Sequence, residues 1–392
     1  MDSEVFITDG HWRKSLAAVR ALGRKGIRVT VGESTRLATA AFSKYCHRAV
    51  VYPSPRQRPS EFVNFLFREL SCRSYQMLLP MEDETLDLLS QYRSELSHLT
   101  YLPIVSFEKL QTARRKDKIL RLAQRQGIPI PKTWFIGNIS QLNELKCSLP
   151  YPVVIKPQMS SGAVGISYPK NPDELMKQYL SIHQRFPYPF IQERIPREGP
   201  GYGASFLLNE KGEVKASFVH KRLREYPVTG GASTLRESVR RDDIRDMALT
   251  LLNALDWFGV AMVEFKVDRR DGIPKLMEIN PRFWGSLSLA ISAGVNFPYL
   301  LYRMSRGENF KPVEHYQIGK RCRWLLPGDI LHFIYNPRRT SLLPEFFHFW
   351  DRNTAYDILS LTDPLPVLGR IMTPLTFIYD QDMKQRLKKR TP

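Results

Sequence analysis

Two glutamates lie in short alternating segments on either side of a turn-forming sequence. In residues 262–280, polar and apolar side chains alternate, which is typical of strands that bury one face. The residues from Arg269 to Gly272 predict a turn, and the resulting hairpin would place Glu264 opposite Glu278. Directly opposed strand residues have Cβ atoms about 4.5–5.5 Å apart, so two carboxylates in these positions repel each other.

A bound cation would remove this repulsion. Asn280 and Arg282 follow Glu278 on the same polar face. Mg²⁺ and Mn²⁺ prefer oxygen ligands, and Mg²⁺ keeps coordination positions for water or substrate phosphates. The alternative is a hairpin face that simply meets solvent, but the repulsion and the neighbouring amide and guanidinium argue against it. We therefore expect a divalent cation such as Mg²⁺ between the carboxylates of Glu264 and Glu278, beside a segment that binds phosphate.

The segment VVIKPQMSSGAVGI could be that phosphate-binding segment. Lys156 ends an apolar strand, and the loop that follows contains Ser160, Ser161, Gly162 and Gly165. Glycine lets the backbone approach a phosphate, and successive N–H groups can cradle it. An ordinary hairpin loop would explain the same residues. The segment is not a Walker P-loop, because no Gly-Lys-Ser/Thr ends it and no helix follows.

Length and composition predict a globular protein of two or three domains. A chain of 392 residues exceeds one ordinary core, and its 43% hydrophobic and 25% charged residues are typical of globular proteins. The four cysteines lack the spacing of a disulfide framework or a zinc site, which fits a reducing compartment. The start, MDSEVFITDG, does not resemble a signal peptide, and no long apolar run predicts a membrane span. These features favour a cytoplasmic location.

The net charge of +19 predicts anionic partners without specifying them. Nucleic acid is not expected, because aromatic and basic residues do not interleave as they do in recognisable nucleic-acid modules. The segments FIYNPRR, FFHFW and MKQRLKKR combine aromatic or apolar residues with basic ones, which suits peripheral contact with an anionic membrane at its inner face. An ordinary capping subdomain with a basic tail is the alternative.

The order of strands and helices divides the chain into three parts. Residues 1–104 alternate strands and helices, which predicts an α/β domain with a parallel sheet. Their first loop, Thr-Asp-Gly, lacks the G-x-G-x-x-G pattern of a dinucleotide site. Residues 105–305 begin with a basic helix and continue through strands, hairpins and helices, and residues 306–392 mix apolar, aromatic and basic segments.

This series of elements resembles the ATP-grasp superfamily. MEINPR with the upstream VEF is the most specific part, and Lys-Pro followed by the Gly/Ser loop supports it. The resemblance covers about residues 105–305 and implies an ATP-grasp domain with a lid subdomain at about residues 128–195, in a chain of mixed α/β and α+β class. Residues 1–104 resemble the Rossmann-like pre-ATP-grasp domain that usually precedes this fold. Residues 306–392 would form a C-terminal subdomain and tail.

The resemblance implies roles for individual residues around ATP. Lys118 and Lys156 would contact the ATP phosphates, and the loop of residues 160–165 would close over them as a lid. Glu264, Glu278 and Asn280 would hold Mg²⁺ (or Mn²⁺) ions that bridge the phosphates.

The same resemblance implies which residues contact the adenine and ribose of ATP and which contact the reacting acyl-phosphate. Glu193 and the backbone near Arg194 and Ile195 would meet adenine and ribose. Arg282 would steady an acyl-phosphate and its transition state.

The resemblance also implies that the segment HKRLREYPVTGGASTLRES borders the substrate carboxylate or the γ-phosphate. Lys221 and Arg222 are the candidate catalytic residues here, but the sequence does not decide which of Lys221, Arg222 and Arg224 points inward. His220 is expected to be structural or peripheral.

The resemblance implies a carbon–nitrogen ligase that releases ADP. It would activate a small or peptide-like carboxylate as an acyl-phosphate, which an amine then attacks. One alternative is a bicarbonate-using enzyme with carboxyphosphate as intermediate. An alternative of another class is a non-catalytic nucleotide-binding or membrane-surface protein. The sequence leaves the substrates and the oligomeric state open, a homodimer included.

Overall fold

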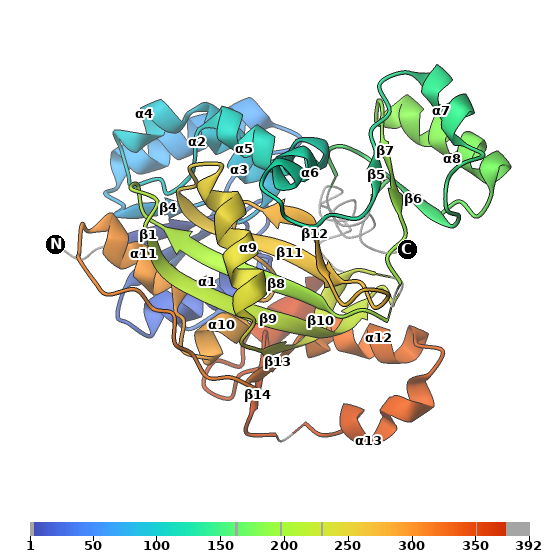
Figure 1. The fold of residues 1–392 in the computed structure, drawn as a ribbon. Helices are drawn as coiled ribbons and strands as arrows, with labels where there is room; N and C mark the ends of the chain where they lie inside the picture. Colours follow the sequence, from blue (N-terminus) through green and yellow to red (C-terminus); the bar gives the residue numbers. More distant parts are fainter. Residues whose placement is uncertain (1–3, 161–163, 197, 229, 350, 374–392) are drawn as a thin grey trace.

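The computed structural model describes residues 4–373, apart from residues 161–163, 197, 229 and 350. It contains three β-sheets, which Figure 1 shows with their covering helices. The first is a parallel sheet in the order β3-β2-β1-β4, as the alternating sequence predicts. Its strands are β1 (Glu4–Ile7), β2 (Arg28–Glu33), β3 (Arg48–Val51) and β4 (Met77–Leu79).

Helices cover both faces of this parallel sheet. Strand residues alternate between two cores: Phe6 packs with α2 (Pro59–Cys72) and α3 (Asp83–Gln91), whereas Val5 and Ile7 pack with α1 (Arg13–Gly23). The 3₁₀ helix η1 (Thr39–Phe42) and the short helix α4 (Arg93–Ser97) complete this part. Strands β1 and β4 are buried along their whole length, whereas β3, at one edge, alternates between half-buried and exposed residues.

The central sheet has seven strands in the order β12-β11-β8-β9-β10-β13-β14. Its neighbouring strands are antiparallel except for β13 and β14. Helix α9 (Asp242–Asn253) covers one face, while α10 (Leu287–Ser292) and α11 (Phe297–Ser305) join α1 on the other (Figure 1). The strands are β8 (Gly201–Leu208), β9 (Val214–Tyr226), β10 (Ala232–Ser238), β11 (Gly259–Val267), β12 (Pro274–Asn280), β13 (Arg321–Arg323) and β14 (Thr354–Tyr356).

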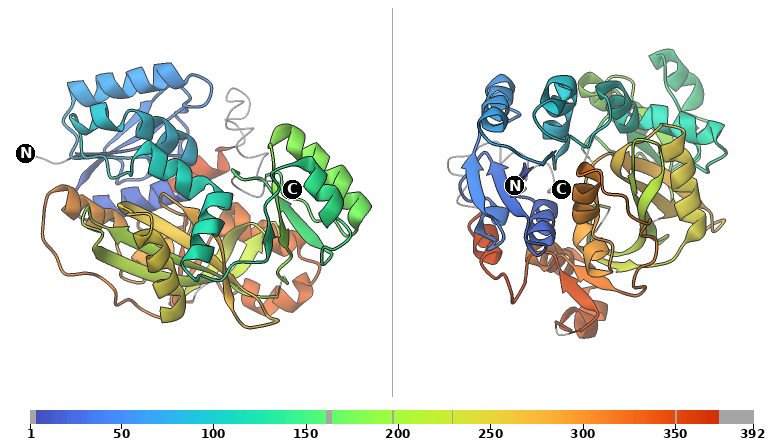
Figure 2. Two further views of the ribbon diagram at one scale, coloured as in Figure 1. Left: turned by 45° about the horizontal axis from the view of Figure 1, so that its top comes forward. Right: turned by 90° about the vertical axis from the view of Figure 1, so that its left-hand side faces the viewer.

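A small antiparallel sheet in the order β5-β7-β6 forms a separate unit at one end of the molecule (Figure 2). Its strands are β5 (Thr133–Trp134), β6 (Val153–Lys156) and β7 (Phe190–Glu193), and helices α7 (Ile139–Leu145) and α8 (Pro172–Arg185) pack on it around a core of their own. Helices α5 (Phe107–Arg114) and α6 (Lys116–Arg125) connect this unit to the first sheet, and α6 packs against β12.

The C-terminal segment extends the central sheet instead of standing apart. Strand β13 pairs with β10, so the sheet continues past the boundary predicted at residue 305. The remaining elements are η2 (Leu325–Asp329), α12 (Ile330–Tyr335), η3 (Arg339–Leu342), α13 (Leu343–Phe346) and α14 (Pro366–Ile371). Among the described residues, no helix has the length and apolar composition needed to cross a membrane.

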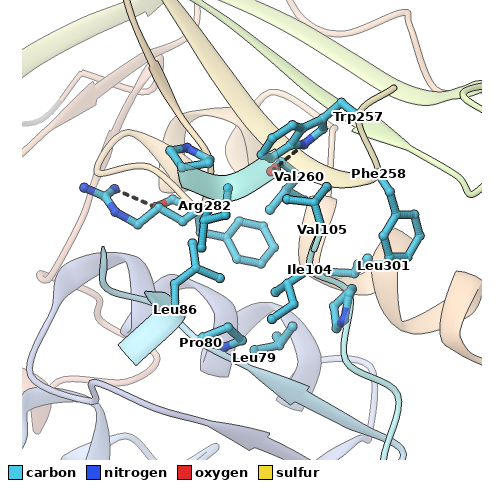
Figure 3. Close-up of a pocket in the computed structure, with 14 residues that line it drawn as sticks. Leu79, Pro80, Leu86, Ile104, Val105, Trp257, Phe258, Val260, Arg282 and Leu301 are labelled. Atoms are coloured by element: carbon cyan, nitrogen blue, oxygen red, sulfur yellow. Dashed lines mark hydrogen bonds between the residues drawn. The ribbon is translucent and has the colours of Figure 1, made fainter. Parts of the chain in front are cut away.

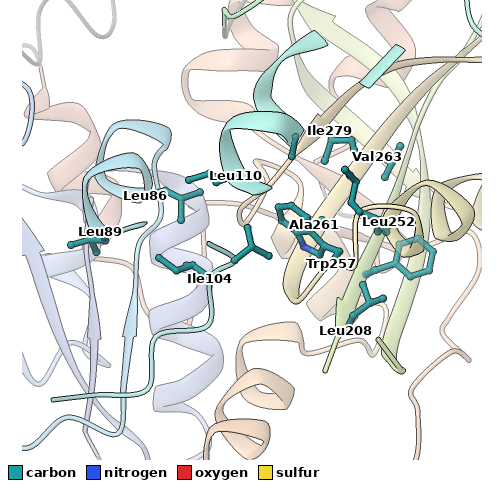
Figure 4. Close-up of a cluster of buried hydrophobic side chains, with 14 of the residues drawn as sticks. Leu86, Leu89, Ile104, Leu110, Leu208, Leu252, Trp257, Ala261, Val263 and Ile279 are labelled. Carbon is teal, nitrogen blue, oxygen red and sulfur yellow. The ribbon is translucent and has the colours of Figure 1, made fainter. Parts of the chain in front are cut away.

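One apolar core joins the first sheet to the central sheet. Figure 4 shows Leu86 of α3 and Leu110 of α5 on one side of this core, with Val263 of β11 and Ile279 of β12 on the other. This core fixes the hairpin that carries the two glutamates relative to the N-terminal helices.

Truncation of a hairpin side chain in this core should destabilise the whole protein. Phe265 is 1% exposed, and we expect Phe265→Ala to lower the free energy of unfolding by about 3–5 kcal/mol, because it removes buried surface and leaves a cavity. Phe107→Ala, at a side chain that is 39% exposed, is the matched control and should cost far less. Equal midpoints of urea denaturation for the two variants would contradict this description of the core.

Candidate active site

The hairpin of β11 and β12 brings the two predicted carboxylates together. Glu264 lies directly opposite Glu278, and Met262 lies opposite Asn280, so the predicted register is confirmed. The side-chain amide of Asn280 donates a hydrogen bond of 2.9 Å to Glu264 Oε1. One detail of the predicted alternation is wrong: a β-bulge after Glu264 places Leu276 opposite Phe265, which leaves Met277 half-buried. The bulge absorbs one residue without moving the carboxylates apart.

Two cations lie against the opposed carboxylates. Lys116 Nζ is 2.9 Å from Glu278 Oε2, and the guanidinium of Arg222 pairs with Glu264. Burial would raise the pKa of Glu278, but Lys116 and Arg222 outweigh it and hold that pKa below its usual range. Burial raises the pKa of Glu264, and the facing Glu278 adds to the effect. The repulsion that the sequence predicts is therefore offset here by side chains from α6 and β9.

The lysine that reaches this cluster is Lys116, not the predicted Lys118. Helix α6 buries Ile119, Leu120 and Ala123, and this fixes its rotation so that Lys118 points to solvent. Lys116, at the first turn, donates to the carbonyl oxygen of Ser160 at 2.7 Å as well as pairing with Glu278. The structure does not bring Lys118 to the carboxylates.

Lys156 lies at the end of β6, facing the same cluster. Its ammonium donates to Gln192 Oε1 at 2.7 Å. Burial, reinforced by the charge of Lys116, lowers the pKa of Lys156 to about 8. Lys156 is half-buried, and a lysine whose charged form is disfavoured in this way is suited to receive an anion, because the anion would favour the charged form.

The loop after Lys156 is described only in part. Ser161 and Gly162, both predicted to cradle phosphate, lie outside the described residues. Ser160 contributes its carbonyl oxygen to Lys116. Gly165 has φ +75, and a Cβ there would lie 2.7 Å from the ring of Pro157, so this turn requires glycine.

Glu193 sits at the far end of the hairpin in an ion network. Its carboxylate is 2.7 Å from Arg270 Nη2 and 3.2 Å from Lys275 Nζ, and both cations also pair with Asp268. These contacts tie the small sheet to the hairpin turn.

The two residues after Glu193 lie in different surroundings. The Arg194 guanidinium stacks 5.4 Å from the ring of Tyr168, and Ile195 is buried. The three residues predicted to meet adenine and ribose are therefore continuous, but they lie apart from the paired carboxylates.

Strand β9 separates the three basic residues that the sequence left undecided. Arg222 faces Glu264, whereas Lys221 is the register partner of Tyr202 and so lies on the opposite face of the sheet. The prediction that Lys221 belongs to the site is contradicted by this alternation. Arg224 shares the face of Arg222 but turns to Asp329 at 3.1 Å.

His220 is buried in the sheet, as expected of a structural residue. Burial and the charge of Arg222 lower its pKa to about 3, and its Nε2 lies 3.2 Å from Ser286 Oγ. A Cβ on Gly203 would lie 2.4 Å from the His220 ring, so this glycine makes room for it.

Arg282 is held by the N-terminal domain. Its Nε and Nη2 donate to the two carboxylate oxygens of Asp83 at 2.8 and 2.9 Å. Arg282 with Lys14 keeps the pKa of Asp83 low in spite of burial. Arg282, Leu86 and Trp257 are among the residues that line a cavity of about 20 Å³, which has room for a single water molecule (Figure 3).

Sequence reasoning missed Lys14, Glu82 and Asp83. Lys14 Nζ is 2.8 Å from Glu82 and donates to the carbonyl oxygen of Phe283 at 3.2 Å. Buried Asp9 orients this loop by accepting the N–H groups of Met81 and Glu82. Their position just after the parallel strands β1 and β4 was the available signal, because ligands bind at the carboxyl ends of such strands.

The oxygen donors of the hairpin suit a hard cation that is coordinated by protein side chains and by phosphate together. Among the described residues, no group of three or more His, Cys, Asp or Glu side chains forms a complete metal site. Glu264, Glu278 and Asn280 offer two carboxylates and an amide oxygen, which is the partial set that Mg²⁺ uses when phosphates and water fill its other positions. The side chain of Glu278 is 34% exposed and that of Glu264 14%, so Glu278 is the more accessible ligand.

Comparison with known proteins points to one superfamily. A family model described as "ATP-grasp in the biosynthetic pathway with Ter operon" matches residues 207–325. The N-terminal section of the carbamoyl phosphate synthase large chain from Methanopyrus kandleri is 23% identical over 228 residues, 55% of this chain and 40% of that protein. D-aspartate ligase from Enterococcus faecium is 23% identical over 241 residues, 56% of each chain. The matches thus span about half the length of these curated relatives.

A solved structure agrees at the level of the fold. Biotin carboxylase from Campylobacter jejuni, in a beta-gamma-ATP complex, superposes with a TM-score of 0.68 and 15% identity, covering 81% of this chain and 74% of that one. Its similarity extends over the parallel N-terminal sheet as well as the antiparallel sheets that follow. The sheet order and the solved structure show that the chain has an ATP-grasp fold, and the family model and the related sequences give it a resemblance to ATP-grasp enzymes.

Proposed function

We propose that this protein is an ATP-dependent ligase that activates a carboxylate as an acyl-phosphate and joins it to an amine. The observation that carries the proposal is the pair of opposed carboxylates, Glu264 and Glu278, which lies within reach of Lys116 and Arg222 and faces Lys156. A compact cluster of negatively and positively charged side chains suits a metal–triphosphate, because the carboxylates can coordinate the cation and the lysines can bind the phosphates.

The proposed reaction needs positioning and charge neutralisation more than a reactive side chain. An oxygen of the substrate carboxylate attacks the γ-phosphorus of ATP, the bond to the bridging oxygen breaks, and ADP leaves. The amine nitrogen then attacks the acyl carbon, inorganic phosphate departs with its electron pair, and the nitrogen loses a proton. Bound Mg²⁺ would supply charge neutralisation at the phosphates.

Each residue has a defined part in this scheme. Lys116 and Lys156 would bind phosphate oxygens, and Glu264, Glu278 and Asn280 would hold the cation. Arg282 would face the acyl-phosphate, with its direction set by the two hydrogen bonds to Asp83. We assign Glu193, Arg194 and Ile195 to the adenine and ribose end.

The relatives support two substrate classes. The name D-aspartate ligase favours joining of a carboxylate and an amine. The similarity to carbamoyl phosphate synthase and to biotin carboxylase keeps a bicarbonate-activating reaction as the second candidate, with carboxyphosphate in place of the acyl-phosphate.

Mg²⁺-dependent release of ADP from the purified protein tests the proposal. Pools of amino acids, small carboxylates and amines would be screened with and without bicarbonate. ADP release that requires one carboxylate and one amine would establish the ligase, and release stimulated by bicarbonate alone would favour the second candidate. Nucleotide binding with no ADP release in any pool, bicarbonate included, would contradict both reactions and favour a binding role.

Neutralising the more accessible carboxylate should stop turnover. We expect Glu278→Gln to lower the rate of Mg²⁺-dependent ADP release by roughly 10²–10³-fold, because one ligand charge is lost at the point where phosphate charge develops. Circular dichroism should be unchanged. Glu213→Gln, at an exposed glutamate in the turn between β8 and β9, is the control and should keep full activity. Normal turnover by Glu278→Gln would refute the assignment of the metal ligands.

The two lysines of α6 should differ in their effect on nucleotide binding. Lys116→Met removes a cation next to Glu278 and Ser160 and should weaken binding of MgADP by roughly tenfold or more, as for loss of one charged hydrogen bond. Lys118→Met changes a solvent-exposed side chain and should leave the dissociation constant within about twofold. Titration calorimetry measures the dissociation constant of MgADP for each variant. A larger loss of affinity in Lys118→Met than in Lys116→Met would favour the original prediction that Lys118 contacts the phosphates.

Nucleotide affinity should fall as the pH rises through the pKa of Lys156. That pKa is lowered to about 8, and phosphate binds the protonated ammonium, so affinity should decrease from about pH 7 to about pH 9.5 and binding should take up protons in that range. Lys156→Arg keeps its charge throughout and should give a flat profile. Calorimetry in buffers of different ionisation enthalpy measures the proton uptake. A wild-type profile as flat as that of the variant would show that Lys156 does not contact the phosphates.

A further inference from the structure

A hairpin near the C-terminus presents large apolar side chains to solvent. It comprises residues 330–349, from α12 to α13, and is called the α12–α13 hairpin below. Figure 1 shows it at the lower right edge of the molecule, with α12 beside β10 and α13 farther out. Four of its side chains are well exposed: Ile334 (51%), Tyr335 (64%), Leu343 (43%) and Phe347 (56%). Burying such residues is favourable, so an exposed cluster of them is typical of an interaction surface.

The exposed side chains stand on a packed base. The ring of Phe346 is buried, stacks on Phe333 at 4.3 Å between ring centroids, and meets Phe347 edge-on at 5.3 Å. The guanidinium of Arg323 lies 4.5 Å from the Phe346 ring. This small aromatic core holds the hairpin in one shape, so its outer residues are presented in a fixed arrangement before any partner binds.

The same hairpin is anchored to the strand that carries Arg222. His332 Nδ1 lies 2.6 Å from the carbonyl oxygen of Glu225, and Glu345 pairs with Arg224 at 3.0 Å. The ring of Tyr335 lies 5.9 Å from that of Tyr226, at the end of β9. A surface bound by the hairpin would therefore lie close to the substrate side of the candidate active site.

Two arginines complete the exposed face. Arg338 and Arg339 lie in the bend between Ile334 and Leu343, and both are exposed. Within the described part of the chain, neither is paired with an acidic side chain, whereas Glu345 is engaged by Arg224 and Arg321. The face thus combines aliphatic and aromatic side chains with uncompensated positive charge, on a protein whose net charge is +19.

We propose that the α12–α13 hairpin docks on an anionic lipid surface. Interfacial segments place Leu, Ile and aromatic residues at the acyl boundary and arginines at the head groups. Binding to a nucleic acid would gain from the two arginines, which can pair with phosphates. It would not gain from Ile334 and Leu343, because their aliphatic side chains make no favourable contact with a phosphate backbone. The sequence segment MKQRLKKR, also considered for lipid contact, lies outside the described residues, and the hairpin is argued without it.

Co-sedimentation of the full chain with lipid vesicles tests the proposal. Vesicles of phosphatidylcholine containing phosphatidylglycerol should bind the protein at about 0.05 M salt, binding should fall at about 0.5 M salt, and vesicles of phosphatidylcholine alone should bind weakly. We expect Arg338→Glu with Arg339→Glu to lower the partition coefficient by roughly 30-fold or more. Leu343→Ser with Phe347→Ser should lower it by roughly tenfold or more.

Matched variants separate the hairpin from the general charge and hydrophobicity of the protein. Lys177→Glu with Lys211→Glu makes the same change in net charge at exposed positions elsewhere, and Ile318→Ser removes an apolar side chain that is 53% exposed outside the hairpin. Both controls should bind as the wild type does. All variants change exposed residues, so circular dichroism should show wild-type folding.

Three results would overturn the proposal. They are absence of wild-type binding to the anionic vesicles at low salt, equal binding by hairpin and control variants, and capture of duplex DNA in preference to vesicles with the same dependence on Arg338 and Arg339. The first would remove lipid as the partner, the second would place binding elsewhere on the chain, and the third would assign the face to nucleic acid.

Discussion

The repulsion between Glu264 and Glu278 is the constraint on which the site depends. Two carboxylates at directly opposed strand positions are stable only beside positive charge. Here Lys116 comes from α6, the helix that packs on the edge strand β12, and Arg222 comes from β9, the fourth strand of the sheet counted from that edge. A cation that entered between the carboxylates would compete with both side chains and release them toward the phosphates that accompany it. The arrangement is thus neutralised without a ligand and still able to exchange its internal cations for a bound one.

Local patterns in the sequence predicted those features of the structure that are set by residues close together along the chain. The hairpin register followed from strand alternation and one turn, and the antiparallel pairing of Glu264 with Glu278 needs nothing further. Alternation could not assign Lys221 and Arg222 to faces, because it fixes only that they differ. The helix pattern could not choose between Lys116 and Lys118 until the burial of Ile119 and Leu120 fixed the rotation of α6.

Contacts between distant segments were beyond prediction from one sequence. Arg282 meets Asp83 across 199 positions, and the continuation of the central sheet by β13 depends on a pairing with β10 that no local pattern encodes. The β-bulge at Met277 was also not predictable, because one extra residue shifts the alternation of apolar residues and no residue type in the sequence signals it. The parallel N-terminal sheet was predictable because strand–helix alternation leaves few other topologies.

The C-terminal segment decides which arginines of β9 remain available to the site. Arg222 and Arg224 lie on the same face, and charge alone does not distinguish them. Arg224 forms ion pairs with the buried Asp329 and with Glu345. Arg222 instead pairs with Glu264. The hairpin that supplies Glu345 also carries the exposed apolar face. Arg224 therefore links the α12–α13 hairpin to the same strand, β9, that carries Arg222 into the candidate active site.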